Sequence, residues 1–267
     1  MQGSLTFLGT GTSMGVPTVG CGCAVCTSAD PHDRRLRPSV LLRWPNAANS
    51  GRKHAVVIDT GPDFREQALR AGLTHVDAVF YTHCHADHIF GLDDLRPLSF
   101  ATLRETGAPI ALYAAPETAE VLRRVYEYTF SPDATYPTRA KVALQPLDDR
   151  IAVHGVEFRT VPVLHGEQEI RGFRFGRAAY FTDVSDIPES SFAMLNGLDV
   201  VVLSALRHKP HPSHATLEQA VTWAERIGAR QTWLTHIAHD LPHEQTNRML
   251  PGNIQLAYDG LSVPVSL

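Results

Sequence analysis

Residues 81–94 read YTHCHADHIFGLDD and place three histidines and an aspartate within six positions: His83, His85, Asp87 and His88. Imidazoles and carboxylates bind divalent metals, and burying four of them together without a metal has no evident packing benefit. The apolar run before them predicts a strand, so His83 and His85, two residues apart, should point to one face. We expect the chain then to turn, which brings Asp87 and His88 in from another direction. The stretch therefore predicts part of a site for two neighbouring metal ions.

Three more candidate ligands occur farther along the chain, and each directly follows an apolar β-like run. His165 follows VPVL, Asp183 follows AAYFT and His236 follows TWLT. A single polar residue at a strand end is more often a turn or capping residue. Strand ends that deliver several ligands to one edge, however, are how a rigid scaffold builds a site, so the first cluster favours a metal role for these three.

The apolar pattern alternates short strands with helices along all 267 residues, and no linker is long enough to separate domains. We predict strands at 4–9, 39–44, 55–59, 77–82, 141–147, 156–164, 170–175, 178–182, 199–205, 230–235, 254–258 and 261–265. We predict helices at 63–72, 116–130, 188–195, 215–228 and 243–250. This order favours an α/β (α+β) fold of two stacked sheets flanked by helices, in a single domain over residues 1–267.

Composition narrows the class of partner and the compartment. The formal net charge of -4 gives no basic field for a nucleic acid polymer, so we expect none as a partner. The beginning, MQGSLTFLG, lacks the basic and long apolar regions of a secretory signal, and no apolar run approaches the roughly 18 residues of a membrane span. With four cysteines that do not resemble a secreted disulfide framework, we expect a cytoplasmic protein without membrane contact.

Three of those cysteines, Cys21, Cys23 and Cys26, lie close together in GCGCAVCTS. A structural zinc takes four ligands, so a fourth must come from elsewhere. Cys84 is the remaining thiol, but it lies between two histidines that should face the metals and would then point away as a small buried hydrophobe. His239, three residues beyond His236, is the better candidate and predicts a Cys₃His zinc. The alternative is three reduced cysteines in a surface loop.

Together these clusters resemble the metallo-β-lactamase superfamily over essentially the whole chain. The resemblance implies a four-layer αββα sandwich with a two-metal centre at the sheet edge. It also implies the ligand sets: His83, His85 and His165 for one ion, Asp87, His88 and His236 for the other, and Asp183 as the bridge. True β-lactamases usually carry a cysteine at the bridging position, and a carboxylate there is typical of the phosphoesterase and thioesterase branches.

Three further stretches, FLGTGTSMGVPTVGCGCAVC, SHATLEQAV and THIAHD, resemble the family of phosphoribosyl 1,2-cyclic phosphate phosphodiesterases of the carbon–phosphorus lyase pathway. That resemblance implies hydrolysis of a small cyclic phosphodiester, on ribose or on a 2′,3′-cyclic nucleotide. It also implies a Cys-rich structural zinc, to which His239 would belong, and a histidine ahead of a helix, here His214. Relatives are often dimers, so we expect a homodimer.

The expected chemistry is attack on phosphorus by a hydroxide that bridges two divalent ions, zinc or manganese. Asp87 would be both a ligand and a hydrogen-bond partner of the nucleophile, and His214 would be the general acid for the leaving oxygen. The segment ALRHKPHP before His214 does not map onto the family pattern. Its Arg207, His208 and His211 are weaker candidates for phosphate contacts, because loop residues of these types are usually solvated.

Three rival functions stay open. A tRNase Z-like RNA 3′-processing endonuclease shares similar stretches, although the net charge of -4 and the lack of a basic arm argue against it. A thioester or lactone hydrolase would use the same metals to polarise a carbonyl. A non-catalytic metalloprotein with the same fold is the third, and the complete set of seven ligand positions argues against it.

Overall fold

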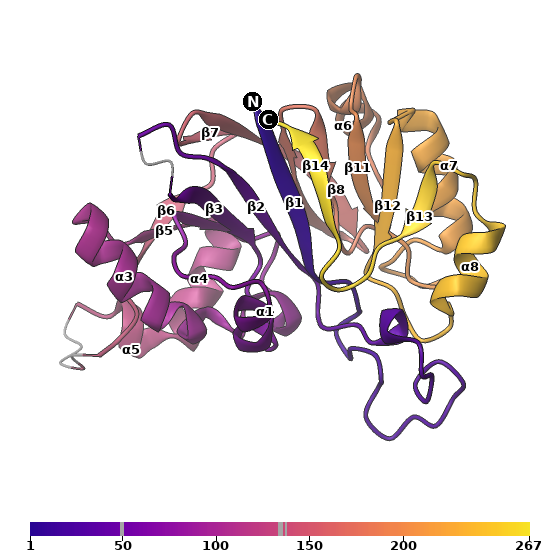
Figure 1. Cartoon of the computed structure of the whole chain (residues 1–267), viewed down its shortest axis with the longest axis horizontal. Coiled ribbons are helices and arrows are strands. Elements are labelled where there is room, and N and C mark those ends of the chain that lie inside the picture. Colours follow the sequence, from indigo (N-terminus) through magenta and orange to yellow (C-terminus); the bar gives the residue numbers. More distant parts are fainter. Residues whose placement is uncertain (49–50, 133–135, 137) are drawn as a thin grey trace.

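The computed structural model describes residues 1–48, 51–132, 136 and 138–267, and in these residues two seven-stranded sheets face each other (Figure 1). In order across the first sheet lie β14 (Ser262–Ser266), β1 (Gln2–Gly9), β2 (Ser39–Pro45), β3 (Lys53–Ile58), β4 (Ala78–Phe80), β5 (Ile110–Ala114) and β6 (Val142–Pro146). In order across the second lie β13 (Ile254–Leu256), β12 (Gln231–Thr235), β11 (Val200–Ser204), β10 (Ala178–Tyr180), β9 (Gln168–Phe175), β8 (Val156–His165) and β7 (Arg150–Val153).

Helices cover the outer face of each sheet, which makes four layers (Figure 1). The first sheet is covered by α1 (Phe64–Arg70), α3 (Arg96–Thr106), α4 (Pro116–Val125) and α5 (Glu127–Phe130). The second is covered by α6 (Glu189–Phe192), α7 (Leu217–Ile227) and α8 (His243–Met249). The short helix α2 (Ala86–Ile89) lies in the loop after β4, and 3₁₀ turns occur at Pro31–Asp33, Leu92–Leu95 and Ala193–Leu195. This is the αββα sandwich of the metallo-β-lactamase fold.

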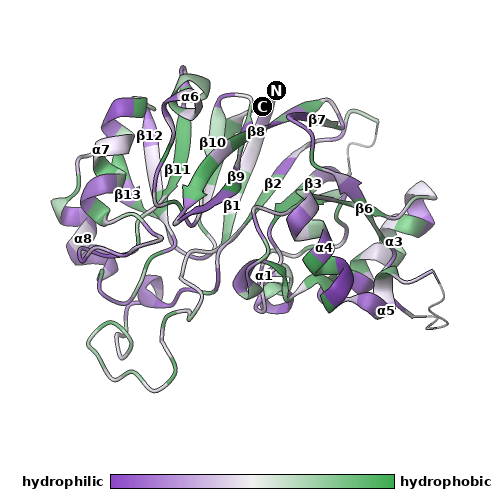
Figure 2. Cartoon of the chain, turned by 180° about the vertical axis from the view of Figure 1, so that it is seen from behind, coloured by the Kyte–Doolittle hydropathy of each residue, from purple (hydrophilic) through white to green (hydrophobic). Residues whose placement is uncertain are grey.

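Hydrophobic side chains fill three interfaces between these layers. Between the sheets, Phe80 of the first stacks on Phe158 of the second at a ring-centroid distance of 4.5 Å. Leu122 of α4 is buried against the outer face of the first sheet, and Ala220 of α7 against that of the second. Figure 2 shows the same pattern, with mostly hydrophobic strands inside and hydrophilic stretches on the helices. The sheet edges are thereby held rigidly enough to position side chains.

Helix α7 begins at a defined residue. The Thr216 hydroxyl accepts the N–H of Gln219, and the Gln219 side chain accepts the N–H of Thr216, which forms a capping box. The helix ends at Gly228, whose φ of 66° is left-handed. Because the cap fixes the start of the helix, it also fixes His214, two residues earlier.

The structure corrects several predicted elements. Strand β4 ends at Phe80, so His83 and His85 lie in the following loop, not on a strand as predicted. The predicted helix 116–130 is two helices, α4 and α5, which meet at Tyr126. Strands β5 and β7 and helix α3 were not predicted; the inner face of α3 buries the polar residues Ser99 and Thr102, which hides its apolar periodicity.

Among the described residues, every helix is too short or too polar to cross a lipid bilayer.

Candidate active site

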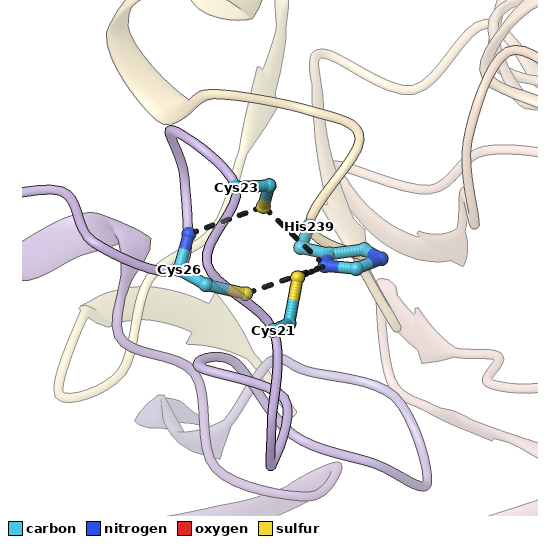
Figure 3. Close-up of side chains that lie close together, drawn as sticks. All are labelled: Cys21, Cys23, Cys26 and His239. Atoms are coloured by element: carbon cyan, nitrogen blue, oxygen red, sulfur yellow. Dashed lines mark hydrogen bonds between the residues drawn. The ribbon is translucent and has the colours of Figure 1, made fainter.

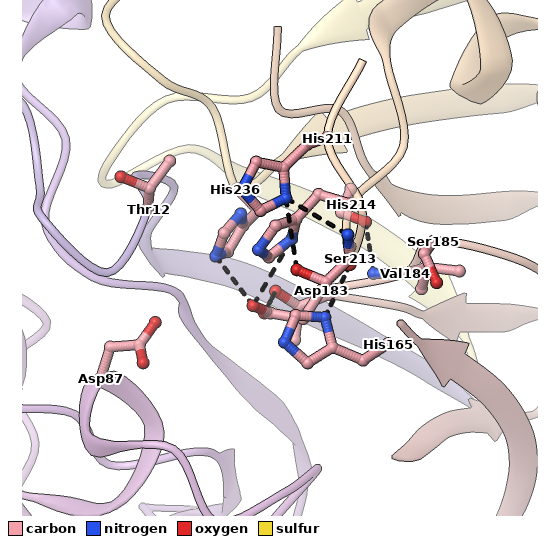
Figure 4. A network of polar contacts seen from close by, with 12 residues as sticks. Thr12, Asp87, His165, Asp183, Val184, Ser185, His211, Ser213, His214 and His236 are labelled. Carbon is pink, nitrogen blue, oxygen red and sulfur yellow. Dashed lines mark hydrogen bonds and ion pairs between the residues drawn. The ribbon is translucent and has the colours of Figure 1, made fainter. Parts of the chain in front are cut away.

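All seven predicted dimetal ligands meet at one edge of the sandwich, although they come from segments far apart in the sequence. Figure 4 shows four of them, Asp87, His165, Asp183 and His236. His83 and His85 follow β4, His165 ends β8, Asp183 follows β10 and His236 follows β12. The backbones of Asp183 and His236 are left-handed, with φ of 60° and 56°. Non-glycine residues in this conformation are uncommon and cluster at functional sites, and here the turn directs each side chain into the site.

One group consists of the three histidines His83, His85 and His165, with a ring nitrogen of each within 4.8 Å of the others. The ring centroid of His83 lies 4.6 Å from that of His85 and 5.4 Å from that of His165. Rings that converge in this way present three nitrogen ligands to one point.

A second group consists of Asp87 and His88 from α2 together with Asp183 and His236. Nε2 of His88 lies 3.2 Å from Asp87 Oδ2 and 3.1 Å from Asp183 Oδ2, and Nε2 of His236 lies 3.0 Å from Asp183 Oδ1. Asp183 also lies within 4.8 Å of a ring nitrogen of His165. Its carboxylate is therefore placed between the two groups.

Hydrogen bonds determine which nitrogen of each imidazole carries the proton. His88 donates from Nδ1 to Asp59 Oδ2 at 2.8 Å, and His165 donates from Nδ1 to the Ser213 carbonyl at 2.7 Å. The Thr82 hydroxyl donates to Asp59, so at 3.0 Å it accepts from Nδ1 of His83. Each ring therefore has a bare Nε2 lone pair, which is the form that binds a metal.

These donors fit divalent cations. The Nε2 atoms of His83, His88 and His236 are buried and form no hydrogen bond among the described residues. A bare Nε2 about 3 Å from a carboxylate oxygen is repulsive unless a cation lies between them, and tetrahedral ligands with bonds of 2.0–2.1 Å are about 3.3 Å apart. The ion pairs of Asp87 and Asp183 within the described chain are to histidines, not to lysine or arginine.

The pKa values of His83 and His88 are shifted by burial and by the carboxylates around them. Burial lowers the pKa of His83 well below its usual value. Burial also lowers the pKa of His88, but Asp87, Asp183 and Asp59 outweigh burial and raise it well above its usual value. Three carboxylates around one ring require positive charge there, and a divalent ion would supply it.

Sequence reasoning missed Asp59, although the residue follows the apolar run AVVI and so obeys the rule that identified His165, Asp183 and His236. Asp59 is fully buried with a left-handed φ of 63°. It accepts the Thr82 N–H at 2.8 Å in addition to the Thr82 hydroxyl and His88. It therefore orients the ring of His88, a candidate ligand, from the side opposite Asp87 and Asp183.

The thiol cluster gathers around His239 (Figure 3). Sγ of Cys21, Cys23 and Cys26 lies 3.2, 3.5 and 3.3 Å from Nδ1 of His239. A tetrahedral zinc with Zn–S of 2.3 Å and Zn–N of 2.0–2.1 Å separates S and N ligands by about 3.5 Å, which these distances match. The backbone N–H of Cys26 donates to Cys23 and lowers the pKa of that thiol to about 7. The four side chains thus fit a structural zinc.

Cys84 lies outside this group. It is half-buried, whereas we predicted a buried side chain beneath the site. The prediction assumed a strand at His83–His85, and the loop that is present there does not impose strict alternation of faces.

His214 lies beside the second group. Its ring stacks on that of His236, with centroids 4.7 Å apart and planes 16° apart, and its Nδ1 lies 3.9 Å from Asp183 Oδ1 (Figure 4). Nδ1 is buried and has no hydrogen-bond partner among the described residues, so Nε2 is the nitrogen left to face the open side of the ring. Burial, and then His236, lowers the pKa of His214 to about 3. At neutral pH the ring is therefore uncharged until an anion arrives.

A cavity of about 200 Å³ opens next to His214 and His236. His211 lines it, with its ring centroid 4.9 Å from that of His214, and its Nδ1 accepts the Ser213 N–H at 3.3 Å. The proton of neutral His211 is thus on Nε2. Arg207 lines the same cavity, and its guanidinium donates to the carbonyls of Lys209 and Pro210. His208 is not part of the lining and pairs with Glu218.

Comparison with known proteins agrees with this geometry. The family model described as a β-lactamase superfamily domain matches residues 54–237. A solved structure described as a new diphosphatase from the PhnP family is 54% identical, covers 99% of this chain and 98% of its own, and superposes with a TM-score of 0.90.

Two curated relatives match over part of their length. An octanoyltransferase of Porphyromonas gingivalis is 38% identical over 259 residues, which is 96% of this chain and 50% of that protein. A ribonuclease Z of Picosynechococcus is 34% identical over 128 residues, 47% of this chain and 33% of that protein. The chain spans half or less of the length of these two relatives.

Proposed function

This chain belongs to the PhnP family of the metallo-β-lactamase superfamily, and from that premise we propose that it is a metal-dependent hydrolase whose substrate is a small cyclic phosphodiester. This substrate class comprises phosphoribosyl 1,2-cyclic phosphate and 2′,3′-cyclic nucleotides. The observation that carries the proposal is the place of His214, whose ring stacks on His236 in the lining of a cavity of about 200 Å³. A cavity of this size suits a ligand smaller than the drug-sized molecules that fill about 300–1,000 Å³.

The ligand assignment is part of this proposal. His83, His85 and His165 would hold one divalent ion, Asp87, His88 and His236 the other, and Asp183 would bridge them. The bare Nε2 atoms and the two converging groups support it. When bound, two zinc or manganese ions would lower the pKa of water and neutralise charge on the phosphoryl oxygens.

The chain's own residues supply the rest of the chemistry. Asp87 is mostly buried and faces the second group, where it would also accept a hydrogen bond from the attacking water. His211 would donate from Nε2 to a substrate oxygen. Once the negative charge of the phosphodiester has raised the pKa of the ring, His214 would take up a proton from solvent and would then give that proton from Nε2 to the leaving ribose oxygen.

Replacing His214 by alanine is expected to keep both dimetal ions and to slow turnover of a cyclic ribose phosphate by about 10²–10⁴-fold, as for loss of a general acid. A substrate with an activated aryl leaving group needs no proton and should lose far less. The measurement is kcat on both substrates with metal analysis of the same sample. Equal losses on both would remove the acid role and leave a binding role.

A second candidate substrate is a diphosphate bond, which the 54%-identical diphosphatase of the PhnP family favours. Hydrolysis of a phosphoanhydride expels a phosphate, which is a better leaving group than the alkoxide expelled from a cyclic ribose phosphate. This substrate would therefore depend less on His214 than a cyclic phosphodiester would.

Turnover of a defined panel tests the function. The purified protein is given cyclic ribose phosphates, 2′,3′-cyclic nucleotides, bis-aryl phosphodiesters, diphosphate esters, thioesters, lactones and precursor tRNA. The highest kcat/KM is expected on a cyclic phosphodiester. Preference for precursor tRNA would support a tRNase Z-like enzyme, preference for thioesters or lactones would move the activity to acyl transfer, and no turnover at all would favour a non-catalytic metalloprotein.

We propose a separate structural zinc on Cys21, Cys23, Cys26 and His239. Cys23→Ser or His239→Ala should each lose one equivalent of zinc and lower the melting temperature, because the metal closes the N-terminal loop onto the loop after β12. Cys84→Ala is the matched control and should keep that zinc. Zinc lost from Cys84→Ala but kept by His239→Ala would invert the assignment.

The homodimer, the cytoplasmic location and the single domain over residues 1–267 stay predictions. Light scattering of the purified protein tests the first, and limited proteolysis the last.

A further inference from the structure

His236 differs from the other buried histidines of the two groups in how its ring is held. His83, His88 and His165 each form a hydrogen bond from Nδ1 to a protein oxygen. Nδ1 of His236 is buried and has no hydrogen-bond partner among the described residues. Outer partners of this kind normally orient a metal-binding histidine. The orientation of His236 comes instead from the contact of its Nε2 with Asp183 Oδ1 at 3.0 Å, from stacking on His214 and from its own backbone, which is left-handed.

The backbone of His236 belongs to the loop after β12, and the buried side chain of Arg35 forms hydrogen bonds to this loop. The Arg35 side chain is fully buried, and its guanidinium donates to the carbonyls of Ala238 at 2.8 Å and Leu241 at 2.7 Å. It also donates to Asp33 Oδ1 at 3.0 Å, and the same oxygen accepts the His243 N–H at 2.9 Å. One buried ion pair thus fixes the loop at residues 238, 241 and 243.

The other side of the loop is fixed by backbone hydrogen bonds. Ile237 donates to the Thr10 carbonyl at 2.9 Å, and Ala238 donates to the Leu206 carbonyl at 3.0 Å. Ala238 is therefore held at both its N–H and its C=O, between His236 on one side and His239 on the other. Only the bond at its C=O comes from a side chain, that of Arg35, so it can be removed by substitution.

We propose that Arg35 is a positioning residue for His236, and that it couples the Cys₃His site to the ion held by Asp87, His88 and His236. The proposal rests on the ligand assignment of the proposed function. Arg35 acts through the backbone of the loop and touches neither metal position.

Arginine suits this role better than lysine. Its planar fork supplies several donors in fixed directions, and here they reach two carbonyls and a carboxylate at once. Burial lowers the pKa of Arg35 to about 10, so the group stays charged at neutral pH and keeps its pair with Asp33. A lysine ammonium would keep the charge and could not reproduce the same three directions.

The test is Arg35→Lys with metal affinity as the readout, measured by chelator competition and metal analysis. The affinity of the ion at Asp87, His88 and His236 should fall by about tenfold or more, as for loss of an outer partner. The ion at the three-histidine group should bind as before, and the thiol zinc should stay. Asp33→Asn, which breaks the ion pair but keeps an acceptor for His243, is the second variant if Arg35→Lys does not fold.

Arg52→Lys is the matched control, because Arg52 pairs with Asp77 and Glu105, its side chain is only 14% exposed, and it lies directly before β3 of the first sheet, away from the loop after β12. Both variants should lower the melting temperature, and only Arg35→Lys should weaken the ion. Equal metal affinity in the two variants would overturn the proposal and leave Arg35 as a structural ion pair.

Two further variants separate the possible failures. If His236→Ala does not weaken the ion, the ligand assignment itself is wrong. If His236→Ala weakens it and Arg35→Lys does not, the positioning role alone is wrong.

Combining Arg35→Lys with Cys23→Ser should give a smaller loss of metal affinity than the product of the two single losses, because both substitutions act on one loop. Independent, multiplicative losses would contradict the coupling between the sites.

Discussion

Replacing Asp183 by alanine is expected to reduce turnover by at least about 10³-fold and to release much of the metal from the site, because the proposed bridge between the two ions is lost. The two oxygens of Asp183 lie 3.0 Å from His236 Nε2 and 3.1 Å from His88 Nε2, and the carboxylate also lies near His165. Without it, no other group among the described residues spans both metal positions.

Alanine at this position changes the backbone as well as the charge. Asp183 has a φ of 60°, a conformation that aspartate and asparagine tolerate better than alanine. Asp183→Asn therefore keeps the turn and removes only the charge, and it should lose metal nearly as severely. The measurements are kcat and metal content, with Asp186→Ala, an exposed carboxylate three residues away, as the control. Near-normal turnover of either Asp183 variant would show that the two-metal assignment is wrong.

The sequence predicted the sandwich and the place where its ligands meet, because both depend on local patterns. Apolar runs ending in a polar residue identified His165, Asp183 and His236 at the sheet edge, and the HxHxDH run identified the first cluster. The reason given for His83 and His85 was wrong, since they lie in a loop after β4. Their rings still converge, with centroids 4.6 Å apart, and the Thr82 hydroxyl beside His83 helps to fix the ring of that residue.

What the sequence could not predict depends on contacts between distant residues. Helix α3 turns Ser99 and Thr102 inward, where Ser99 accepts the N–H of Lys141 and Thr102 donates to the carbonyl of Val76. Polar residues on an inner face cancel the apolar period that would reveal a helix. Arg35 was overlooked because the two loop carbonyls to which it donates, those of Ala238 and Leu241, lie 203 and 206 positions away.

For Asp59, the sequence shows a polar residue directly after a predicted strand, which is a local pattern. Its hydrogen bonds to Thr82 and His88, however, join residues far apart in the sequence and could not be predicted. Replacing Asp59 by asparagine is expected to lower the affinity for the ion at His88 by about 10–100-fold, as for other outer partners of metal-binding histidines. Asparagine tolerates the φ of 63°, and its one oxygen can still accept the Thr82 N–H. Its amide nitrogen would then face Nδ1–H of His88, two donors in contact, and the ring would have to move its proton to Nε2, where the metal should bind.

Asp59→Ala should be worse for stability, because the N–H and hydroxyl of Thr82 and the Nδ1–H of His88 would each lose an acceptor in a fully buried place, at about 1–3 kcal/mol for each unpaired group. Asp77→Asn is the control for both variants: Asp77 is also nearly buried and accepts the Ala55 N–H, but lies outside the dimetal groups. Chelator competition measures the metal affinity of all three variants, and thermal unfolding measures their stability. If Asp59→Asn and Asp77→Asn bind metal equally well, Asp59 stabilises the fold without orienting His88.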